Sequence, residues 1–245
     1  MVRFLALSTL VMAGMLGALA QGTTVTVSPP QRTITVSGTA QVQATPTLAL
    51  VVVAVQTQAE TVAAAVEANN TAASRVVQAI NNLRINRLTV RTIDFNVQPI
   101  YEQRPPTAPP STTPPRIVGY QVINRLEARI PGATSTALSS AVSRVIEAAL
   151  NAGANRVDSI QFTLEDMTAA QNQALAQAIN NARSTARAAA AAAGVQIAAL
   201  HSLTTQPAYP PMPYLARAEM AVSGPPIVAG ELTVQSSVTL VYTIR

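Results

Sequence analysis

The stretch "VVQAINNLRINRLTVRTIDFNV" (residues 76–97) joins the apolar end of a predicted helix to a predicted strand. A second stretch, "VIEAALNAGANRVDSIQFTL" (residues 145–164), has the same order: an apolar helix end, then Asn-Arg, then Ile-x-Phe within a strand. The separation between the Asn-Arg pair and the Ile-x-Phe motif is two residues longer in the first stretch than in the second. We interpret the stretches as copies of one strand–helix–strand unit, and the pair predicts a split β-α-β-β-α-β core. Chance similarity between two amphipathic units is the alternative.

Hydrophobic periodicity extends these units into a full set of elements. Helical spacing of apolar residues predicts helices at about residues 59–83, 134–150 and 168–193. Apolar patterns of strand type are found at 33–43, 87–98, 118–130, 156–165, 195–204 and 232–244. Residues 47–56 are apolar on both faces and rich in valine, which predicts a central strand covered on both sides.

The third predicted helix has a thin stripe of mostly small side chains. Its members are Leu175, Ile179, Ala182, Ala186, Ala189 and Ala193. Small side chains let a helix lie close to its neighbour, so we expect tight packing here. The predicted fold class is therefore α+β. It consists of the split core, an extra N-terminal strand, a third long helix and C-terminal strands, in a mixed, mainly antiparallel sheet with helices packed on it.

The N-terminal residues 1–20 have the features of a signal peptide. Arg3 precedes an apolar run, and the stretch ends in Ala18-Leu19-Ala20, a small-x-small cleavage pattern. An uncleaved anchor helix is the alternative, but the apolar run is shorter than the roughly 20 residues that span a bilayer. We expect export, no transmembrane segment after cleavage, an exposed leader at residues 21–32 and a single domain at residues 33–245.

Two proline-rich segments interrupt the pattern, at residues 104–115 and 207–226. The first lies between the two consecutive inner strands of the β-α-β-β-α-β order. Since the repeat needs both halves to bury either one, we interpret residues 104–115 as the projecting tip of a hairpin and not as a linker between domains. The alternative is a docking role, because Pro106-x-x-Pro109 allows a polyproline helix that fits an aromatic groove.

Charge and cysteine content exclude several classes of function. The formal net charge is +5 and every basic residue is arginine. These arginines are scattered singly and aromatic residues make up 3% of the chain, so the pattern does not favour nucleic-acid binding. Because there is no cysteine, the chain has no disulfide framework and no thiolate metal site.

Reactive side chains are few. His201 is the only histidine, and no Gly-x-Ser-x-Gly context accompanies it. Glu165 and Asp166 form the one adjacent acidic pair, where a strand gives way to the third helix, so Asp166 and Thr168 are predicted to cap that helix. The glycines do not form a phosphate-binding loop. We therefore assign no catalytic, cofactor-binding or metal-binding residue, and expect no cofactor and no enzymatic activity.

Six segments in order resemble the SIMPL-domain family, a group of exported bacterial proteins that includes the periplasmic immunogenic proteins. The matching segments are "ITVSGTAQVQATPTLALVVVAVQTQAETVAAAVEANN", "TIDFNVQPIY", "GYQVINRLEARI", "ALNAGANRVDSIQFTLED", "AINNARSTARAAAAAAGVQI" and "GELTVQSSVTLVYTI". Together they cover about residues 33–245. No single segment is specific to the family, but the ordered set of six segments is. The absence of lysine and the enlarged proline loop after Tyr101 depart from the family pattern.

The resemblance implies an α+β domain, a periplasmic or other extracytoplasmic location in the cell envelope, and assembly into larger rings or cages. It also implies a link to oxidative and envelope stress, and it transfers no catalytic residue. We expect a non-enzymatic envelope protein that acts as a homo-oligomer or through binding. The alternatives are a binding module whose proline-rich loops capture a wall polymer or another envelope protein, and an enzyme with an unrecognised site.

Overall fold

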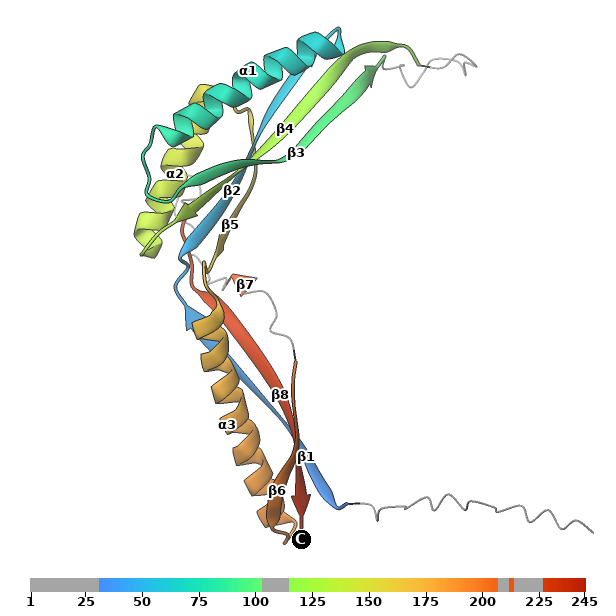
Figure 1. Ribbon diagram of the computed structural model, residues 1–245, viewed down its shortest axis with the longest axis vertical. Coiled ribbons are helices and arrows are strands. Elements are labelled where there is room, and N and C mark those ends of the chain that lie inside the picture. The colour runs from blue at the N-terminus through green and yellow to red at the C-terminus, as the bar shows by residue number, and fades with distance from the viewer. Residues whose placement is uncertain (1–30, 103–114, 207–211, 214–226) are drawn as a thin grey trace, which may run out of the picture. The chain divides into compact units, whose positions relative to one another are not determined.

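The computed structural model describes residues 31–102, 115–206, 212–213 and 227–245 (Figure 1). Their strands divide between two antiparallel sheets, and helices pack on both sheets, which confirms the predicted α+β class. The predicted signal peptide, most of the leader and most of the two proline-rich loops lie outside the described residues.

The central sheet consists of β2 to β5 and contains the predicted split core. Its strands are β2 (Leu48–Ala59), β3 (Thr89–Tyr101), β4 (Ile117–Pro131) and β5 (Arg156–Thr163). Helix α1 (Val62–Asn81) follows β2, and α2 (Ser135–Ala152) follows β4. The chain order is therefore β2-α1-β3-β4-α2-β5, and the spatial order is β3-β4-β2-β5 with every neighbouring pair antiparallel. This arrangement confirms the predicted β-α-β-β-α-β core.

Both helices of the central sheet begin at a capping threonine. The backbone N–H of Ala64 donates to Thr61 Oγ1 at 3.3 Å, and that of Ala137 donates to Thr134 Oγ1 at 3.2 Å. Helix α2 ends at Gly153, whose φ of 122° is one that residues with a Cβ rarely adopt. The capping threonines and Gly153 therefore define these helix boundaries locally, independently of tertiary packing.

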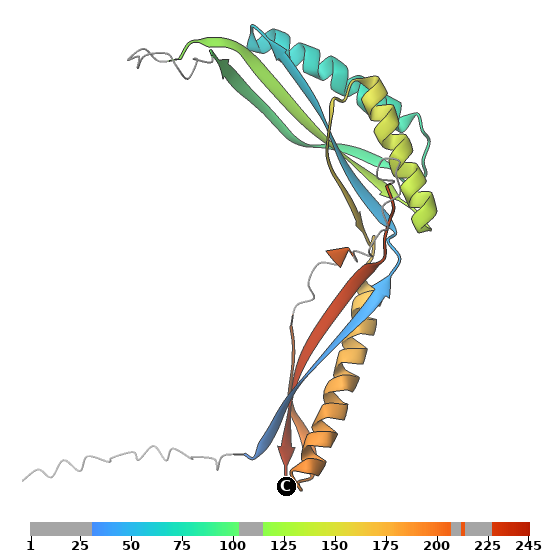
Figure 2. The same ribbon diagram turned by 180° about the vertical axis from the view of Figure 1, so that it is seen from behind.

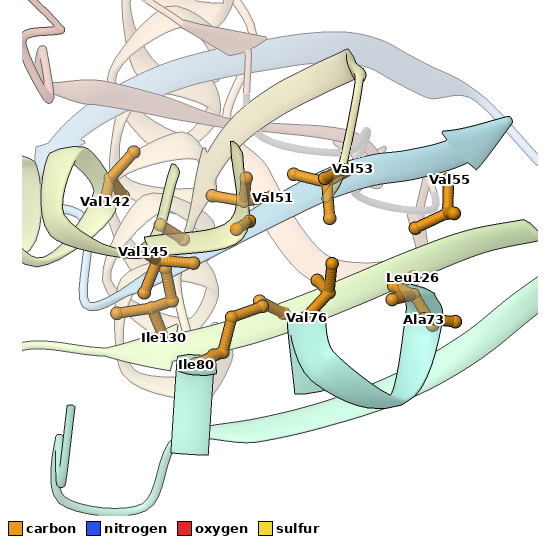
Figure 3. Packing of buried hydrophobic residues seen from close by; sticks show 14 of the residues in the cluster. Val51, Val53, Val55, Ala73, Val76, Ile80, Leu126, Ile130, Val142 and Val145 are labelled. Carbon is orange, nitrogen blue, oxygen red and sulfur yellow. The ribbon is translucent and has the colours of Figure 1, made fainter. Parts of the chain in front are cut away.

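Helices α1 and α2 bury the main core against one face of the central sheet. Figure 3 shows Val76 and Ile80 of α1 and Val142 and Val145 of α2 in this core, and all four are fully buried. The strand residues that meet them include Val51, Val53, Val55, Leu126 and Ile130. Strand β2 is an inner strand of the sheet, as its continuous apolar run predicts.

The terminal sheet consists of β1, β6, β7 and β8. Strand β1 (Thr33–Ala44) pairs along its whole length with β8 (Leu232–Ile244), and β6 (Ile197–Thr205) pairs with the other edge of β8. The two-residue β7 (Met212–Pro213) pairs with the beginning of β8. The pairing confirms that the last strand of the chain is held in a sheet.

Pro46 lies between the strands that belong to different sheets. Strand β1 ends at Ala44 and β2 begins at Leu48. Proline has no N–H to contribute to a strand ladder, so the two strands cannot run on as one. No local sequence pattern specifies the pairing of β1 with β8. This pairing places β1 in a separate sheet together with the C-terminal strands.

Helix α3 (Thr168–Ala192) lies along one face of the terminal sheet (Figure 2) and contacts β1 and β8. Its buried residues are Ala174, Ala178, Ala182, Ala186 and Ala190. The predicted stripe is therefore right at Ala182 and Ala186. It is wrong at Ala189 and Ala193, which are exposed, whereas Leu175 is half-buried and Ile179 is half-buried and packs against the core of the terminal sheet.

The close approach of α3 to β1 centres on Gly38. A Cβ added there would lie 2.2 Å from the carbonyl oxygen of Ala178 and 2.6 Å from the backbone nitrogen of Ala182. Both atoms belong to the helix backbone, so α3 rests directly on the strand. This contact explains why an alanine repeat, and not the stripe that includes Leu175, faces the sheet.

Candidate functional site

The residues singled out by sequence remain apart in the structure. His201 lies in β6 with an exposed side chain. Within the described ranges, no group of three or more His, Asp or Glu side chains is placed to hold a metal ion. The absence of a catalytic role for His201 stays a prediction.

Asp166 lies one residue before the N-cap position of α3, which is Met167 and makes no side-chain capping bond. The Asp166 Oδ1 accepts a hydrogen bond of 2.8 Å from the backbone N–H of Thr168. The hydrogen bond from the Thr168 side chain, and then the one from the Thr168 backbone, lowers the pKa of Asp166. The prediction for Thr168 is wrong in one respect, because Thr168 is the donor to the cap and not the capping acceptor.

The two Asn-Arg copies of the repeat have different roles. The Asn155 side chain accepts from the Gln56 N–H at 3.0 Å and donates to the Gln56 carbonyl at 2.8 Å, and so takes the place of a neighbouring strand. In the other copy Arg87 has a φ of 59° and pairs with Glu165. Sequence reasoning found the repeat but missed both roles, because asparagine before a strand is equally typical of a turn.

A row of ion pairs crosses the face of the central sheet opposite to α1 and α2. Arg125 of β4 pairs with Asp94 of β3 and also, at 2.7 Å, with Asp158 of β5. The Arg156 Nε donates to Asp158 Oδ1 at 2.6 Å. The row therefore links both edge strands of the sheet to the inner strand β4.

The ion-pair row should make the free energy of unfolding depend on pH in the acidic range. The hydrogen bond from Arg156, and then the one from Arg125, holds the pKa of Asp158 below its ordinary value. A carboxyl whose folded pKa is depressed stabilises the protein above its unfolded pKa of about 3.9, and this contribution is lost as the pH falls through the folded pKa. We expect Asp158→Asn to lower the free energy of unfolding at neutral pH by about 1 kcal/mol.

The measurement is urea denaturation at a series of pH values from neutral to strongly acidic. Asp158→Asn should flatten the fall in stability on the acid side, so that the two proteins converge there. Glu67→Gln is the matched control, because Glu67 is exposed on α1 and has no ion pair within the described residues. Parallel curves for Asp158→Asn and wild type would contradict the prediction.

The β3–β4 hairpin has the largest group of exposed apolar side chains among the described residues. Its members are Ile93, Phe95, Val97, Tyr101, Ile117 and Val118, each between 38% and 52% exposed. We call this set the hairpin patch. The two segments that contain most of it, residues 95–101 and 117–124, have no charged residue. Exposed apolar groups that gather on one element are typical of interaction surfaces.

The β3 members of the hairpin patch are exposed because β3 is an edge strand, and Ile117 and Val118 are exposed because they precede the part of β4 that pairs with β2. Phe95 and Val97 lie opposite Asn124 and Val122, so they are on the side of the sheet that faces α1, but both side chains are exposed. Helix α1 contacts the inner strands β2 and β4 more than it contacts β3. The sequence predicted regular alternation through Ile93. The register instead shifts there, because a bulge adds one residue to the strand.

The strands on either side of the first proline-rich segment pair with each other. The backbone N–H of Glu102 donates to the carbonyl of Arg116 at 2.8 Å, and β3 and β4 are antiparallel neighbours in one sheet. The predicted pairing of these two strands is therefore confirmed, whereas the predicted projecting tip falls on residues 103–114, which lie outside the described part. The hairpin patch lies on the strands that lead into and out of this segment.

The comparison with protein families gives one match over most of the chain. The model described as SIMPL, protein of unknown function (DUF541), matches residues 34–242. The chain belongs to the SIMPL family. It is 30% identical over 248 residues to the 26 kDa periplasmic immunogenic protein of Brucella melitensis, with 97% of this chain and 95% of the relative covered. The protein of the same name from Brucella abortus has the same identity and coverage. The family assignment agrees with the resemblance found in the sequence.

None of the helices in the described ranges combines the length and apolar character needed to cross a bilayer.

Proposed function

We propose that this SIMPL protein is an exported, non-enzymatic protein of the cell envelope that acts as a homo-oligomer. The observation that carries the proposal is the hairpin patch. Supporting it are the signal-peptide pattern of residues 1–20 and the periplasmic relatives, which share its length. Protection of the envelope against oxidative stress is the physiological role that we propose for the assembly.

A second copy of the chain is the partner that the patch fits best. Most of the patch lies in segments without charged residues, so its apolar side chains can pack against the same side chains of a second copy, as in a two-fold contact between identical subunits. Strand β3 also presents an edge of the central sheet with unpaired backbone groups, a site at which another strand can add. The bulge at Ile93 and the missing N–H of Pro99 limit that edge to a short stretch.

Light scattering after size-exclusion chromatography tests the self-association. Wild-type chain lacking residues 1–20 should elute at a multiple of the monomer mass, and Tyr101→Ser/Val118→Ser should elute as a monomer with an unchanged melting temperature. The matched control is Leu200→Ser/Leu203→Ser, which removes two equally exposed apolar side chains from the terminal sheet. It should remain oligomeric. A monomeric wild type at high concentration would refute the proposal.

A cellular experiment tests the physiological role. In a strain that lacks the gene, wild-type protein should restore survival under peroxide, and the control double variant should do the same. The Tyr101→Ser/Val118→Ser protein should not, because it cannot assemble. Equal protection by all three proteins would separate stress protection from assembly and overturn that part of the proposal.

A further inference from the structure

Strand β1 presents a backbone edge on the side opposite to β8. The carbonyl of Ser237, the β8 partner of Thr39, accepts from the Gln206 N–H, so it points toward β6 and not toward β1. Thr39 and Ser237 are therefore a pair without mutual hydrogen bonds, and the backbone groups of Thr39 point away from β8. Because this alternation has a period of two residues, the odd-numbered residues of β1 all direct their N–H and C=O groups to this outer edge.

The outer edge of β1 lacks the features that protect edge strands. Strand β1 pairs with β8 without a register shift, and residues 33–44 contain no proline and no charged residue. Charges, prolines and bulges are the usual means by which an edge strand avoids pairing with a further strand. The edge strand β3, by contrast, has both a bulge at Ile93 and a proline, Pro99. The backbone of β1 can therefore accept another strand.

Asn181 of α3 limits how far an added strand can extend. Its Nδ2 donates to the Thr39 carbonyl at 2.9 Å and so occupies one of the acceptors on the outer edge. Among the described residues, the outer-edge groups of Thr33, Thr35 and Ser37 have no hydrogen-bond partner. An added strand therefore fits opposite residues 33–38.

The sequence just before β1 contains a segment of that length with the pattern of a strand. Residues 23–28 read Thr-Thr-Val-Thr-Val-Ser and repeat the alternation of residues 33–37, which read Thr-Ile-Thr-Val-Ser. Alternating β-branched residues favour a strand. The two runs are separated by residues 29–32, Pro-Pro-Gln-Arg. Four-residue loops are common in β-hairpins, so the first run can fold back on the second.

A four-residue connection fixes the register and the faces of the added strand. It places Val27 opposite Ile34. Two residues further along, it places Val25 opposite Val36. Val36 belongs to the core beneath α3 and Ile34 packs against it, so both valines project to the apolar side of the sheet. A shift by one residue would turn the valines to the polar face. The loop length and the side-chain pattern therefore agree on one register.

We propose that residues 23–28 add to the outer edge of β1 as a further strand of the terminal sheet. Thr26 exchanges two backbone hydrogen bonds with Thr35, and the residues two positions away on either side do the same with Thr33 and Ser37. This strand takes the place of the exposed leader expected from the sequence, and it covers an edge that would otherwise pair with other chains. Because a two-stranded hairpin is marginal in water, the strand adds after β8 has paired with β1.

Amide hydrogen exchange on the chain lacking residues 1–20 tests the added strand. Relative to their intrinsic rates, the N–H groups of Thr35 and Ser37 should exchange about tenfold more slowly than that of Gln41, or more slowly still. Gln41 is the matched control, because it faces the same edge but lies beyond Asn181. Removing residues 21–30 as well should abolish the difference and leave the rate at Gln41 unchanged.

The proposal does not depend on self-association, because the hairpin patch lies on β3 and β4. Exchange in the Tyr101→Ser/Val118→Ser protein should therefore show the same protection of β1 as exchange in the wild type.

Proline variants test the direction of the backbone groups in the added strand. Thr26→Pro removes an N–H that points to β1, and it should speed exchange at Thr35 and Ser37 as far as removal of residues 21–30 does. Val25→Pro is the matched control. Its N–H points away from β1, so most of the protection should remain.

An engineered disulfide tests which chain supplies the strand. The protein has no cysteine, so Thr26→Cys/Thr35→Cys introduces a single pair of thiols. The Cα atoms of such directly opposed residues are about 5.5 Å apart, which a disulfide can span. Oxidation should close the bond within one chain, which runs at the monomer mass on a non-reducing gel. Thr26→Cys/Gln41→Cys is the matched control and should stay reduced, because its thiols are held too far apart.

Three results would overturn the proposal. One is equal exchange of the Thr35, Ser37 and Gln41 amides in the wild type, because the edge would then be free. Another is protection that survives the removal of residues 21–30, because another segment would then cover the edge. The third is a disulfide-linked dimer of the Thr26→Cys/Thr35→Cys protein, which would assign the added strand to a second copy of the chain.

Discussion

Replacing Gly38 with alanine should lower the free energy of unfolding by about 3 kcal/mol. The new methyl group would lie 2.2 Å from the Ala178 carbonyl oxygen and 2.7 Å from the Ala182 Cβ. These distances are far below van der Waals contact, and the first obstacle is helix backbone, which cannot rotate away. Helix α3 must therefore move off β1 and lose part of the contact made by its alanine repeat.

Urea denaturation followed by circular dichroism measures this loss. Ser37→Ala is the matched control, because Ser37 is the preceding residue of β1 and its side chain is exposed. We expect the control to change stability by no more than about 0.5 kcal/mol. If Gly38→Ala were as stable as the control, α3 could not rest on the strand as closely as described.

Replacing Ile80 with alanine should lower the free energy of unfolding by about 3 kcal/mol. Ile80 is fully buried near the end of α1, and Figure 3 shows it within the core together with Val76 and Ile130. Alanine removes three carbon atoms and leaves a cavity, because neither the strands beneath nor α2 beside it can close the space completely. The loss combines the transfer free energy of the missing atoms with the cost of that cavity.

Val62→Ala is the control on the same helix. Val62 is 42% exposed, so its truncation removes little buried surface and should cost no more than about 0.5 kcal/mol. Denaturation midpoints of the two variants, measured side by side, give the comparison. Equal losses from Ile80→Ala and Val62→Ala would mean that α1 does not pack on the sheet through its Ile80 face.

The helices and strands could be predicted because their signals are local. The helix expected at residues 59–83 is found at Val62–Asn81, between a capping threonine and a terminal turn. The strand expected at residues 118–130 is found at Ile117–Pro131. Side-chain periodicity and caps act over a few residues, so a sequence records them directly.

Contacts between distant segments could not be predicted in the same way. Helix α3 has two stripes of small or apolar residues, and either could face the sheet. The stripe through Ala174 and Ala178 does so because it contacts Gly38, which is far away in the sequence. The hairpin patch depends on where α1 stops covering β3. Only the packed structure reveals that the buried Oδ1 of Asn124 has no donor among the described residues.

The pairing of β1 with β8 has a consequence for the order in which the chain can fold. Thr33 lies opposite Thr243, whereas every strand of the central sheet falls between residues 48 and 163. During synthesis or export the chain emerges with its N-terminal residues first, so β1 appears before the strands of the central sheet and β8 after them. The central sheet can therefore close while β1 still has no strand to join. During that interval β1 is an unpaired strand with apolar side chains on one face, the kind of segment that aggregates or recruits chaperones. Among the described strands, the first to emerge is thus the last to be paired.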